Sequence, residues 1–217
     1  MNWLSGTAFT AFGQHVVWAD MLGNLLGFGG LALGWRRSVW SWPVQLLSGA
    51  VLIAAYLGGD APNPGLIGKQ VIVIAAAAWG WTRWQQGRRS AGEIAVRFAT
   101  WRERAVLTAA LALGTLGLAG LYFANPSWSW SPWADAYIFV GTLAAMYAQA
   151  RGWIEFWFAW IAVDVVGVPL AFNSGYAFSG LTYSIYFVLV LLGLRAWWQR
   201  TRTSRPVSIN IPKGATA

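Results

Sequence analysis

The chain has 217 residues, of which 57% are hydrophobic and only 10% are charged, and its net charge is +8. Soluble domains carry about 25% charged residues, so this composition excludes an ordinary soluble protein and indicates one embedded in lipid. The absence of cysteine excludes disulfides, thiolate metal sites and a cysteine nucleophile. Because the basic residues fall between apolar runs, the positive charge indicates membrane orientation and not nucleic-acid binding.

Residues 1–17 are predicted to form an interfacial segment at the membrane surface. They lack the basic start and the continuous apolar run that a cleavable signal peptide needs. Trp3, Leu4, Phe9 and Phe12 are the side chains of this segment that we expect to face the membrane.

Seven apolar runs follow, each close to the length of about 20 residues that crosses a bilayer as a helix. The predicted spans are 18–35, 39–57, 66–84, 104–123, 134–150, 153–172 and 178–198. Residues 201–217 contain Ser, Pro and Lys and are expected to form a disordered cytoplasmic tail.

The charged residues sort by side when the chain is threaded through these seven spans. All the basic residues except Lys69 fall on one side, whereas Asp20, Asp60 and Asp135 share the other side with Lys69. The positive-inside rule places the basic side in the cytoplasm. We therefore expect the N-terminus outside, the C-terminus inside and an odd number of spans in a multi-pass plasma-membrane protein.

Short motifs that recur in the same order indicate an internal repeat. Trp-Ala-Asp at 18–20 recurs at 133–135, each time at the start of a span, and Gly-x-x-x-Trp at 80–84 recurs at 193–197. Each resemblance is weak alone, and their shared order carries the prediction.

A three-helix bundle can be repeated in the same orientation only if one more helix returns the chain across the membrane. The helix at 104–124 fits that linker role, between a first bundle at 18–87 and a second at 134–200. The predicted fold class is an all-α membrane protein of seven transmembrane helices with a 3+1+3 parallel repeat. Parallel repeats of this kind place a substrate site at mid-membrane between them.

Asp164 is the clearest candidate for a functional residue. It lies in the middle of the sixth span, where a carboxyl group costs about 3 kcal/mol by insertion scales and should face the bundle interior. It is interpreted as a substrate hydrogen-bond partner or a proton-coupling group, with a structural hydrogen bond to another helix as the alternative. Trp157 and Trp160 are predicted to share its helix face, where they suit a planar, polar, uncharged ligand or simply pack.

Further polar side chains lie at depth in the other spans. They are Asn24, Gln45, Ser48, Gln70, Thr142, Tyr147, Tyr183 and Tyr186. Hydrogen bonding between helices is the ordinary explanation for any one of them. Gln70 and Tyr183, however, stand the same number of residues before Gly80 and Gly193, so they are expected to line one cavity. The predicted binding residues are Asn24, Gln45, Gln70, Tyr147, Trp157, Trp160, Asp164, Tyr183 and Tyr186.

Several catalytic motifs are absent. The sequence has no Walker A loop, no G-x-S-x-G and no His/Cys/Glu cluster with metal-ligand spacing. We therefore predict that the chain is not an enzyme, and that it has no cofactor and no metal site.

The arrangement of these residues resembles the Pnu vitamin transporter family, of the PnuC type. The resemblance covers about residues 18–198 and rests on Trp157-x-x-Trp160 with an acid at 164, and on Gln70 ten residues before Gly80-Trp81-x-x-Trp84. It implies a SWEET-like fold, a homotrimer in a bacterial inner membrane, and a uniporter that moves vitamin-derived nucleosides by facilitated diffusion. It also implies that phosphorylation by a separate intracellular kinase traps the substrate.

The sequence departs from the nicotinamide riboside pattern of that family. Ala77, Leu192 and Asp164 stand where that pattern has asparagines, and the stretches 35–40, 152–169 and 175–180 look closer to the bacterial riboflavin transporter branch, the RibM type. Losing two amides makes room for a larger, flatter ring, so riboflavin and its analogues are the favoured substrates. Transport of nicotinamide riboside or thiamine, proton symport, and a non-transporting membrane subunit or receptor remain the alternatives.

Overall fold

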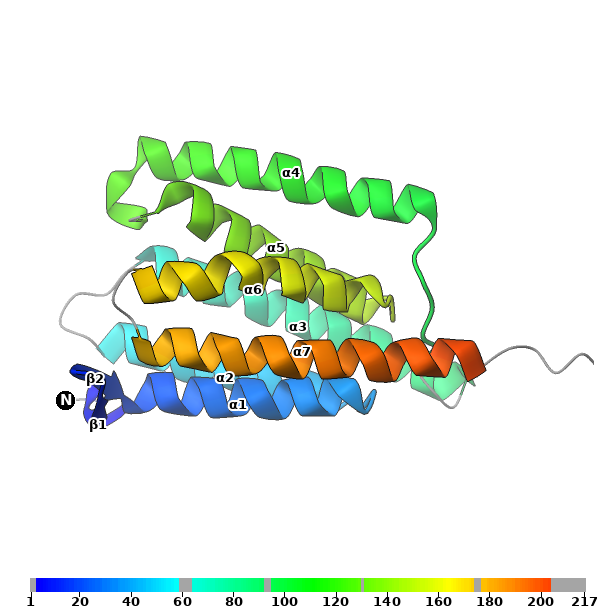
Figure 1. Cartoon of the computed structure of the whole chain (residues 1–217), viewed down its shortest axis with the longest axis horizontal. Helices are drawn as coiled ribbons and strands as arrows, with labels where there is room; N and C mark the ends of the chain where they lie inside the picture. Colours follow the sequence, from blue (N-terminus) through cyan, green and yellow to red (C-terminus); the bar gives the residue numbers. More distant parts are fainter. Residues whose placement is uncertain (1–2, 59–63, 92–94, 130, 174–176, 204–217) are drawn as a thin grey trace, which may run out of the picture.

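The computed structural model describes residues 3–58, 64–91, 95–129, 131–173 and 177–203, and within them seven α-helices follow a short N-terminal hairpin (Figure 1). The helices are α1 (Trp18–Trp35), α2 (Ser41–Gly58), α3 (Pro64–Ala91), α4 (Trp101–Ala124), α5 (Pro132–Ala150), α6 (Glu155–Asn173) and α7 (Ala177–Thr203). The prediction of seven helices is therefore confirmed. Among the described residues, three segments are long and apolar enough by themselves to cross a membrane: α4, α6 and Gly180–Gln199 of α7.

The helix ends differ from the predicted ones where a cap or a turn decides them. Helix α4 begins before residue 104 because Thr100 and Glu103 form a reciprocal capping box, with hydrogen bonds of 2.8 and 3.3 Å. Helix α7 continues to Thr203, so the first residues of the predicted disordered tail 201–217 are helical. The rest of that predicted tail lies outside the described residues.

The N-terminal segment departs from the all-α prediction. It holds a short 3-10 helix η1 (Trp3–Ser5) and an antiparallel pair of strands, β1 (Thr7–Ala11) and β2 (Gln14–Val17). Phe12 and Gly13 join the strands with φ angles of 53° and 74°, and two positive φ angles are what a tight two-residue hairpin turn requires. Four- and five-residue strands are too short to stand out in a sequence dominated by helices.

Helix α4 lies at one edge of the bundle, along α5 (Figure 1). It packs closely there because Gly114 meets the side chain of Val140. Ala119 is its one buried residue within this fully described helix. A helix that is apolar all round yet exposed is expected to face lipid, and α4 therefore takes little part in the core.

The turns after α1 and after α5 close in the same way. Each contains a residue in the left-handed region, Arg37 (φ 58°) in the first and Gly152 (φ 68°) in the second. Their backbone N–H groups donate to the carbonyls of Gly34 and Gln149, both at 2.9 Å. Helices that end at αL residues are common, but here the two turns match residue for residue.

Two tryptophans fill matching spaces above glycines. The ring of Trp42 on α2 covers Gly80 on α3, and the ring of Trp157 on α6 covers Gly193 on α7. A Cβ atom at either glycine would collide with the ring. The two tryptophan rings therefore fit in the core only because a glycine lets the neighbouring helix approach closely at each of these points.

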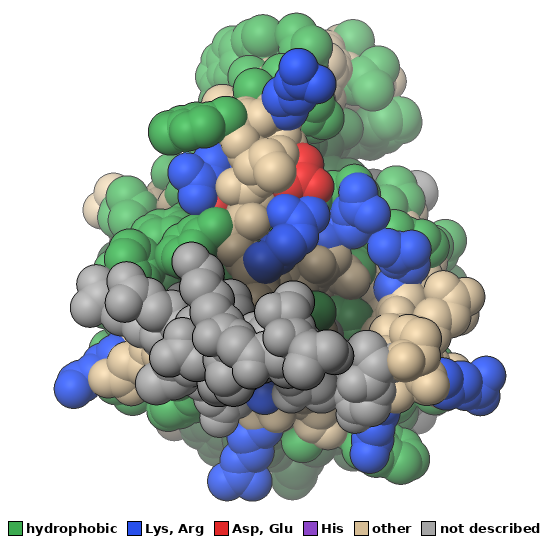
Figure 2. Space-filling view, turned by 90° about the vertical axis from the view of Figure 1, so that its right-hand side faces the viewer, with side chains coloured by type: hydrophobic (Ala, Val, Ile, Leu, Met, Phe, Trp, Pro, Cys, Tyr) green, Lys and Arg blue, Asp and Glu red, His purple; other side chains and the backbone are tan. Residues whose placement is uncertain are grey.

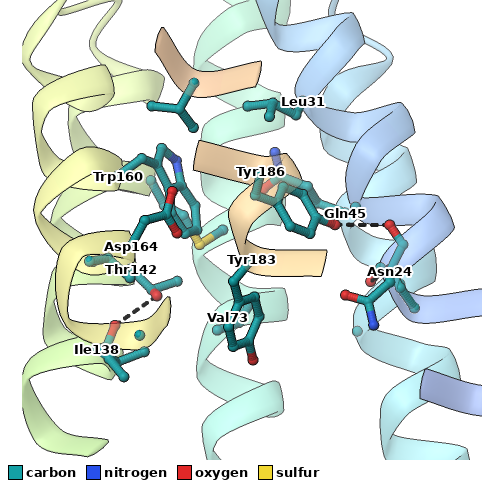
Figure 3. Close-up of a pocket in the computed structure, with 18 of the residues that line it drawn as sticks. Asn24, Leu31, Gln45, Val73, Ile138, Thr142, Trp160, Asp164, Tyr183 and Tyr186 are labelled. Atoms are coloured by element: carbon teal, nitrogen blue, oxygen red, sulfur yellow. Dashed lines mark hydrogen bonds between the residues drawn. The ribbon is translucent and has the colours of Figure 1, made fainter. Parts of the chain in front are cut away.

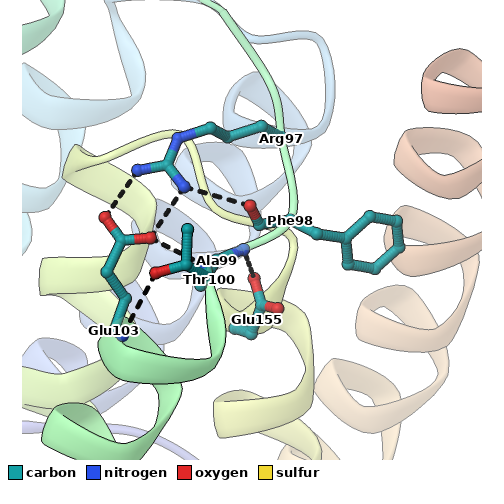
Figure 4. A network of polar contacts seen from close by, with 6 residues as sticks. All are labelled: Arg97, Phe98, Ala99, Thr100, Glu103 and Glu155. Atoms are coloured by element: carbon teal, nitrogen blue, oxygen red, sulfur yellow. Dashed lines mark hydrogen bonds and ion pairs between the residues drawn. The ribbon is translucent and has the colours of Figure 1, made fainter.

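Hydrogen bonds and an ion pair join residues 97–104, at and before the start of α4, to the start of α6 (Figure 4). Glu155 accepts a hydrogen bond of 2.9 Å from the Ala99 backbone and forms an ion pair of 2.8 Å with Arg104. The backbone of Arg97 also exchanges hydrogen bonds of 3.0 Å with Gly152 and Ile154. These contacts hold α4 to the half of the protein that contains α5 and α6.

Replacing Glu155 by alanine is expected to lower the free energy of unfolding by about 1.5–3 kcal/mol, because a largely buried carboxylate and its charged partner lose their hydrogen bonds. Thermal unfolding in detergent measures the effect. The matched control is Glu103→Gln, which retains the capping box and loses only the exposed ion pair with Arg97, worth about 0–1 kcal/mol. Equal losses of stability in the two variants would contradict the role assigned to Glu155.

Candidate functional site

A cavity of about 380 Å³ lies between six of the seven helices (Figure 3). It is lined from α1, α2 and α3 on one side and from α5, α6 and α7 on the other, whereas α4 contributes no described residue. Ligand sites in proteins usually have volumes of about 300–1,000 Å³. The cavity is therefore large enough for a small organic molecule and lies where the two predicted bundles meet.

Seven of the nine predicted binding residues line this cavity. They are Asn24, Gln45, Gln70, Trp160, Asp164, Tyr183 and Tyr186. Figure 3 shows Trp160 and Asp164 on one side of the cavity, Asn24 and Gln45 on the other, and the two tyrosines between them. Polar groups from five helices thus converge on an otherwise apolar space.

Asp164 is the chemically unusual member of the lining. Its side chain is almost fully buried, with 7% exposed, and its Oδ2 atom has no hydrogen-bond partner in the described part of the chain. The carboxyl lies one helical turn after Trp160 on α6, beside the ring (Figure 3). A buried acceptor without a donor costs free energy, and a ligand with an N–H or O–H group would satisfy it.

No lysine or arginine is among the described residues that line the cavity. A buried anionic ligand without a paired cation is strongly disfavoured. The lining therefore favours ligands that are uncharged or cationic and carry hydrogen-bond donors.

Tyr186 bridges α7 and α1 at the cavity wall. Its hydroxyl donates to the Asn24 carbonyl at 2.9 Å, and its ring packs on Phe28 with centroids 4.4 Å apart. Gly27 makes this possible, because a Cβ atom there would collide with the hydroxyl. The tyrosine is consequently held in place before any ligand binds.

The hydroxyls of Ser48 and Thr142 lie on opposite sides of the cavity, and each donates its hydrogen to a backbone carbonyl. Thr142 donates to the Ile138 carbonyl at 2.8 Å (Figure 3), and Ser48 donates to the Gly23 carbonyl at 3.3 Å. Their oxygens retain acceptor capacity towards the cavity. They are therefore secondary candidates for ligand contact.

The structure places Tyr147 and Trp157 outside the lining. Trp157 is fully buried against Phe156, with ring centroids 4.1 Å apart. Tyr147 stacks on Trp79, with centroids 5.5 Å apart. Residues three apart on a helix differ in direction by about 60°, and on α6 that angle separates the ring of Trp157, which packs on α7, from that of Trp160, which faces the cavity.

Among the lining residues that were not predicted, Gln149 and Phe156 lie where the sequence offered least reason to expect them. Each lies close to a helix end, next to basic or acidic residues, where the sequence indicates a membrane interface. Both are buried, at 3% and 1% exposed. The sequence carries no signal for their position, because how far the cavity extends towards the helix ends depends on how the helices pack.

Comparison with known proteins gives three findings. Residues 17–199 match the family model described as nicotinamide mononucleotide transporter. The riboflavin/roseoflavin transporter RibM of Streptomyces davaonensis is 57% identical over 215 residues, which cover 98% of this chain and 100% of that protein. The crystal structure of the vitamin B3 transporter PnuC is similar in fold, with a TM-score of 0.68 at 16% identity, over 87% of this chain and 83% of that one.

Proposed function

The chain belongs to the nicotinamide mononucleotide transporter family, and we propose that it takes up riboflavin and close flavin analogues across the membrane. Its family and its apolar helices make it a multi-pass membrane transporter. Membership of a transporter family confirms the prediction that it is not an enzyme. The resemblance to the PnuC type, closest to the riboflavin branch, is likewise confirmed.

The observation that carries the substrate proposal is the Oδ2 atom of Asp164, which has no hydrogen-bond partner, in an aromatic cavity whose described lining contains no basic residue. Riboflavin is a large uncharged ring system with an imide N–H and a chain of hydroxyl donors. Trp160 and Tyr183 offer aromatic surface for such a ring. Gln70 and Gln45 can bond to its ring or ribityl polar atoms.

The buried carboxyl also favours a second candidate. Nicotinamide riboside and thiamine each carry a cationic ring, which a carboxylate without a basic partner would attract. The two candidates separate in a ligand panel on purified protein, read by flavin fluorescence quenching and by competition. Tight binding of nicotinamide riboside without micromolar binding of riboflavin would overturn the substrate proposal and leave the fold untouched.

The proposed mechanism is facilitated diffusion between two parallel three-helix repeats, 18–87 and 134–200, joined by the linker helix 104–124 in a SWEET-like plan. The matching turns at Arg37 and Gly152 support the repeat, and so do the matching Gly80 and Gly193. Rocking of one repeat against the other would expose the cavity to each side in turn. Phosphorylation by a separate intracellular kinase would then trap the substrate.

The proposed orientation places the arginine-bearing end in the cytoplasm and the N-terminus outside. Arginines follow α1 and α5 and end α3, and Figure 2 looks onto this end and shows basic side chains gathered around it. The exposed side chains of Trp3 in η1 and Phe12 in the hairpin turn support an interfacial role for residues 1–17. A reporter fused to the C-terminus tests the orientation. The homotrimer that the resemblance implies is a separate proposal, and light scattering in detergent tests it.

Proteoliposomes that contain only this chain test the transport proposal. Riboflavin should equilibrate across the membrane without ATP and at the same rate with and without a pH gradient. Dependence on a partner ATPase would show a subunit and not a uniporter. Accumulation driven by the pH gradient would favour proton symport.

Flavin mononucleotide is expected to bind at least about tenfold more weakly than riboflavin, because its phosphate would enter a cavity whose described lining has a carboxyl group and no basic side chain. Fluorescence titration of both ligands at one pH measures the ratio. Roseoflavin, an uncharged analogue, is the control and should bind comparably to riboflavin. Equal affinities for the phosphorylated and unphosphorylated flavin would contradict binding of the flavin in this cavity.

A further inference from the structure

The two halves of the protein meet along two lines of contact, α1 with α7 and α3 with α5. The cavity lies between these lines. Any motion that opens it to one side must separate the helices of at least one line at that side. The interactions that bridge the lines near the arginine-bearing end therefore decide when that end opens.

Each line carries one indole hydrogen bond close to that end. Trp197 on α7 donates from Nε1 to the Trp35 carbonyl on α1 at 3.0 Å. Trp84 on α3 donates from Nε1 to the Gln149 carbonyl on α5 at 2.8 Å. The two bonds are thus of the same kind and join corresponding helices of the two halves.

Both donors stand in the fully buried aromatic layer that closes the cavity at this end. Trp84 is 1% exposed and Trp197 is 0% exposed. Gln149, whose carbonyl accepts one of the bonds, also lines the cavity, as does Phe156, whose ring lies 5.1 Å from that of Trp197. The bonds therefore lie directly behind the cavity lining and are not a remote surface feature.

Burial alone does not require these bonds. Trp42 and Trp157 are equally buried, and their Nε1 atoms have no hydrogen-bond partner in the described structure. Each of them packs edge-on against a bonded tryptophan, Trp42 against Trp84 and Trp157 against Trp197, at 5.5 and 5.7 Å between centroids. In each pair, only the ring that reaches across to the other half donates a hydrogen bond.

The acceptors are suited to a bond that breaks and reforms. Trp35 is the last residue of α1 and Gln149 the last but one of α5, so neither carbonyl accepts the helical hydrogen bond from four residues on, and the Gln149 carbonyl keeps its bond from the Gly152 N–H. Releasing an indole therefore leaves the helices intact. Water that enters from the adjacent membrane surface can then take the place of each indole on its carbonyl oxygen.

We propose that Trp84 and Trp197 form a two-point latch that holds the two halves together at the arginine-bearing end, and that at least one of the two bonds must break for the cavity to open there. The latch rests on transport as the function of the chain, but not on riboflavin as the substrate. It assigns these tryptophans to gating, whereas their partners Trp42 and Trp157 serve packing.

The absence of cysteine allows a direct test. Leu31 lines the cavity one turn before Trp35 (Figure 3), so a Leu31→Cys variant introduces a single thiol behind the latch. A membrane-impermeant maleimide applied to inside-out and right-side-out vesicles, without any substrate, reports how often the arginine-bearing end opens. Since no flavin is present, a wrong substrate assignment does not affect the result.

In this background, Trp84→Phe and Trp197→Phe each remove one indole donor and retain an aromatic ring. Each is expected to raise the rate of labelling from the arginine-bearing end about two- to tenfold, as the loss of one hydrogen bond predicts, and the double variant should exceed both. The matched control is Trp42→Phe, which makes the same change in volume but removes no hydrogen bond, and it should label at nearly the parent rate.

Three results would overturn the latch. The first is unchanged labelling in both variants, and the second is an equal increase in the Trp42→Phe control. The third is loss of folded protein in both variants while Trp42→Phe folds, because the bonds would then be structural. Melting temperatures in detergent separate the third result from the others.

Discussion

Replacing Asp164 by leucine is expected to weaken riboflavin binding by about ten- to a hundredfold and to raise the melting temperature of the empty protein. Both effects have one cause. The Oδ2 atom is buried without a hydrogen-bond partner, and an unsatisfied buried acceptor costs about 1–3 kcal/mol. Leucine removes that cost in the empty protein and removes the acceptor when the ligand is bound, where a hydrogen bond to a charged group is worth about 1.5–3 kcal/mol.

Flavin fluorescence titration and thermal unfolding of the same samples measure the two effects. Asp164→Asn retains an acceptor of similar size and should lose less affinity than the leucine variant. Tyr137→Phe is the matched control outside the cavity lining: it removes the hydroxyl that donates to Ala162 at 3.2 Å and should lower stability slightly without changing affinity. Unchanged affinity in Asp164→Leu would remove Asp164 from the site, and a fall in stability would show that its carboxyl has a structural role.

The arrangement of the helices was predictable because two independent signals agree. Apolar runs of the right length indicate spans, and the restriction of arginine to alternate gaps supports their odd number. Hydropathy has no comparable signal for the hairpin at Thr7–Val17, whose geometry depends on two positive φ angles at Phe12 and Gly13. A phenylalanine in that conformation is uncommon, so nothing in the sequence indicates it.

The polar residues of the cavity lining were predictable, because polar groups in a membrane span must be buried inside the protein. Asp164, Gln70 and Asn24 are costly in lipid and had to face the interior, which is where the structure has them. The aromatic residues follow no such rule, because a tryptophan ring is accepted both in a core and beside a ligand. For Trp157, the space above Gly193 decides that the ring packs in the core and does not face a ligand. That space depends on two helices, so the spacing of residues along one helix does not reveal it.

That space makes Gly193 a position where adding a single methyl group should cost much stability. A Cβ atom there would collide with the ring of Trp157, which is fully buried and has no room to withdraw. Gly193→Ala is expected to lower the free energy of unfolding by about 1–3 kcal/mol, as overpacking does in other cores. Gly193→Leu should prevent folding, because no movement of one ring accommodates a whole side chain.

The matched control is Gly87→Ala on α3, where an added Cβ meets nothing within 4 Å. It should leave the melting temperature unchanged or raise it, because alanine favours a helix over glycine by about 1 kcal/mol. Gly80→Ala, which collides with Trp42 in the other half, should behave as Gly193→Ala does. Adding Trp157→Phe to Gly193→Ala should restore part of the lost stability, since the smaller ring frees the space. A Gly193→Ala protein as stable as Gly87→Ala would show that α6 and α7 separate easily, and the close helix approach could then not hold the aromatic layer behind the cavity in place.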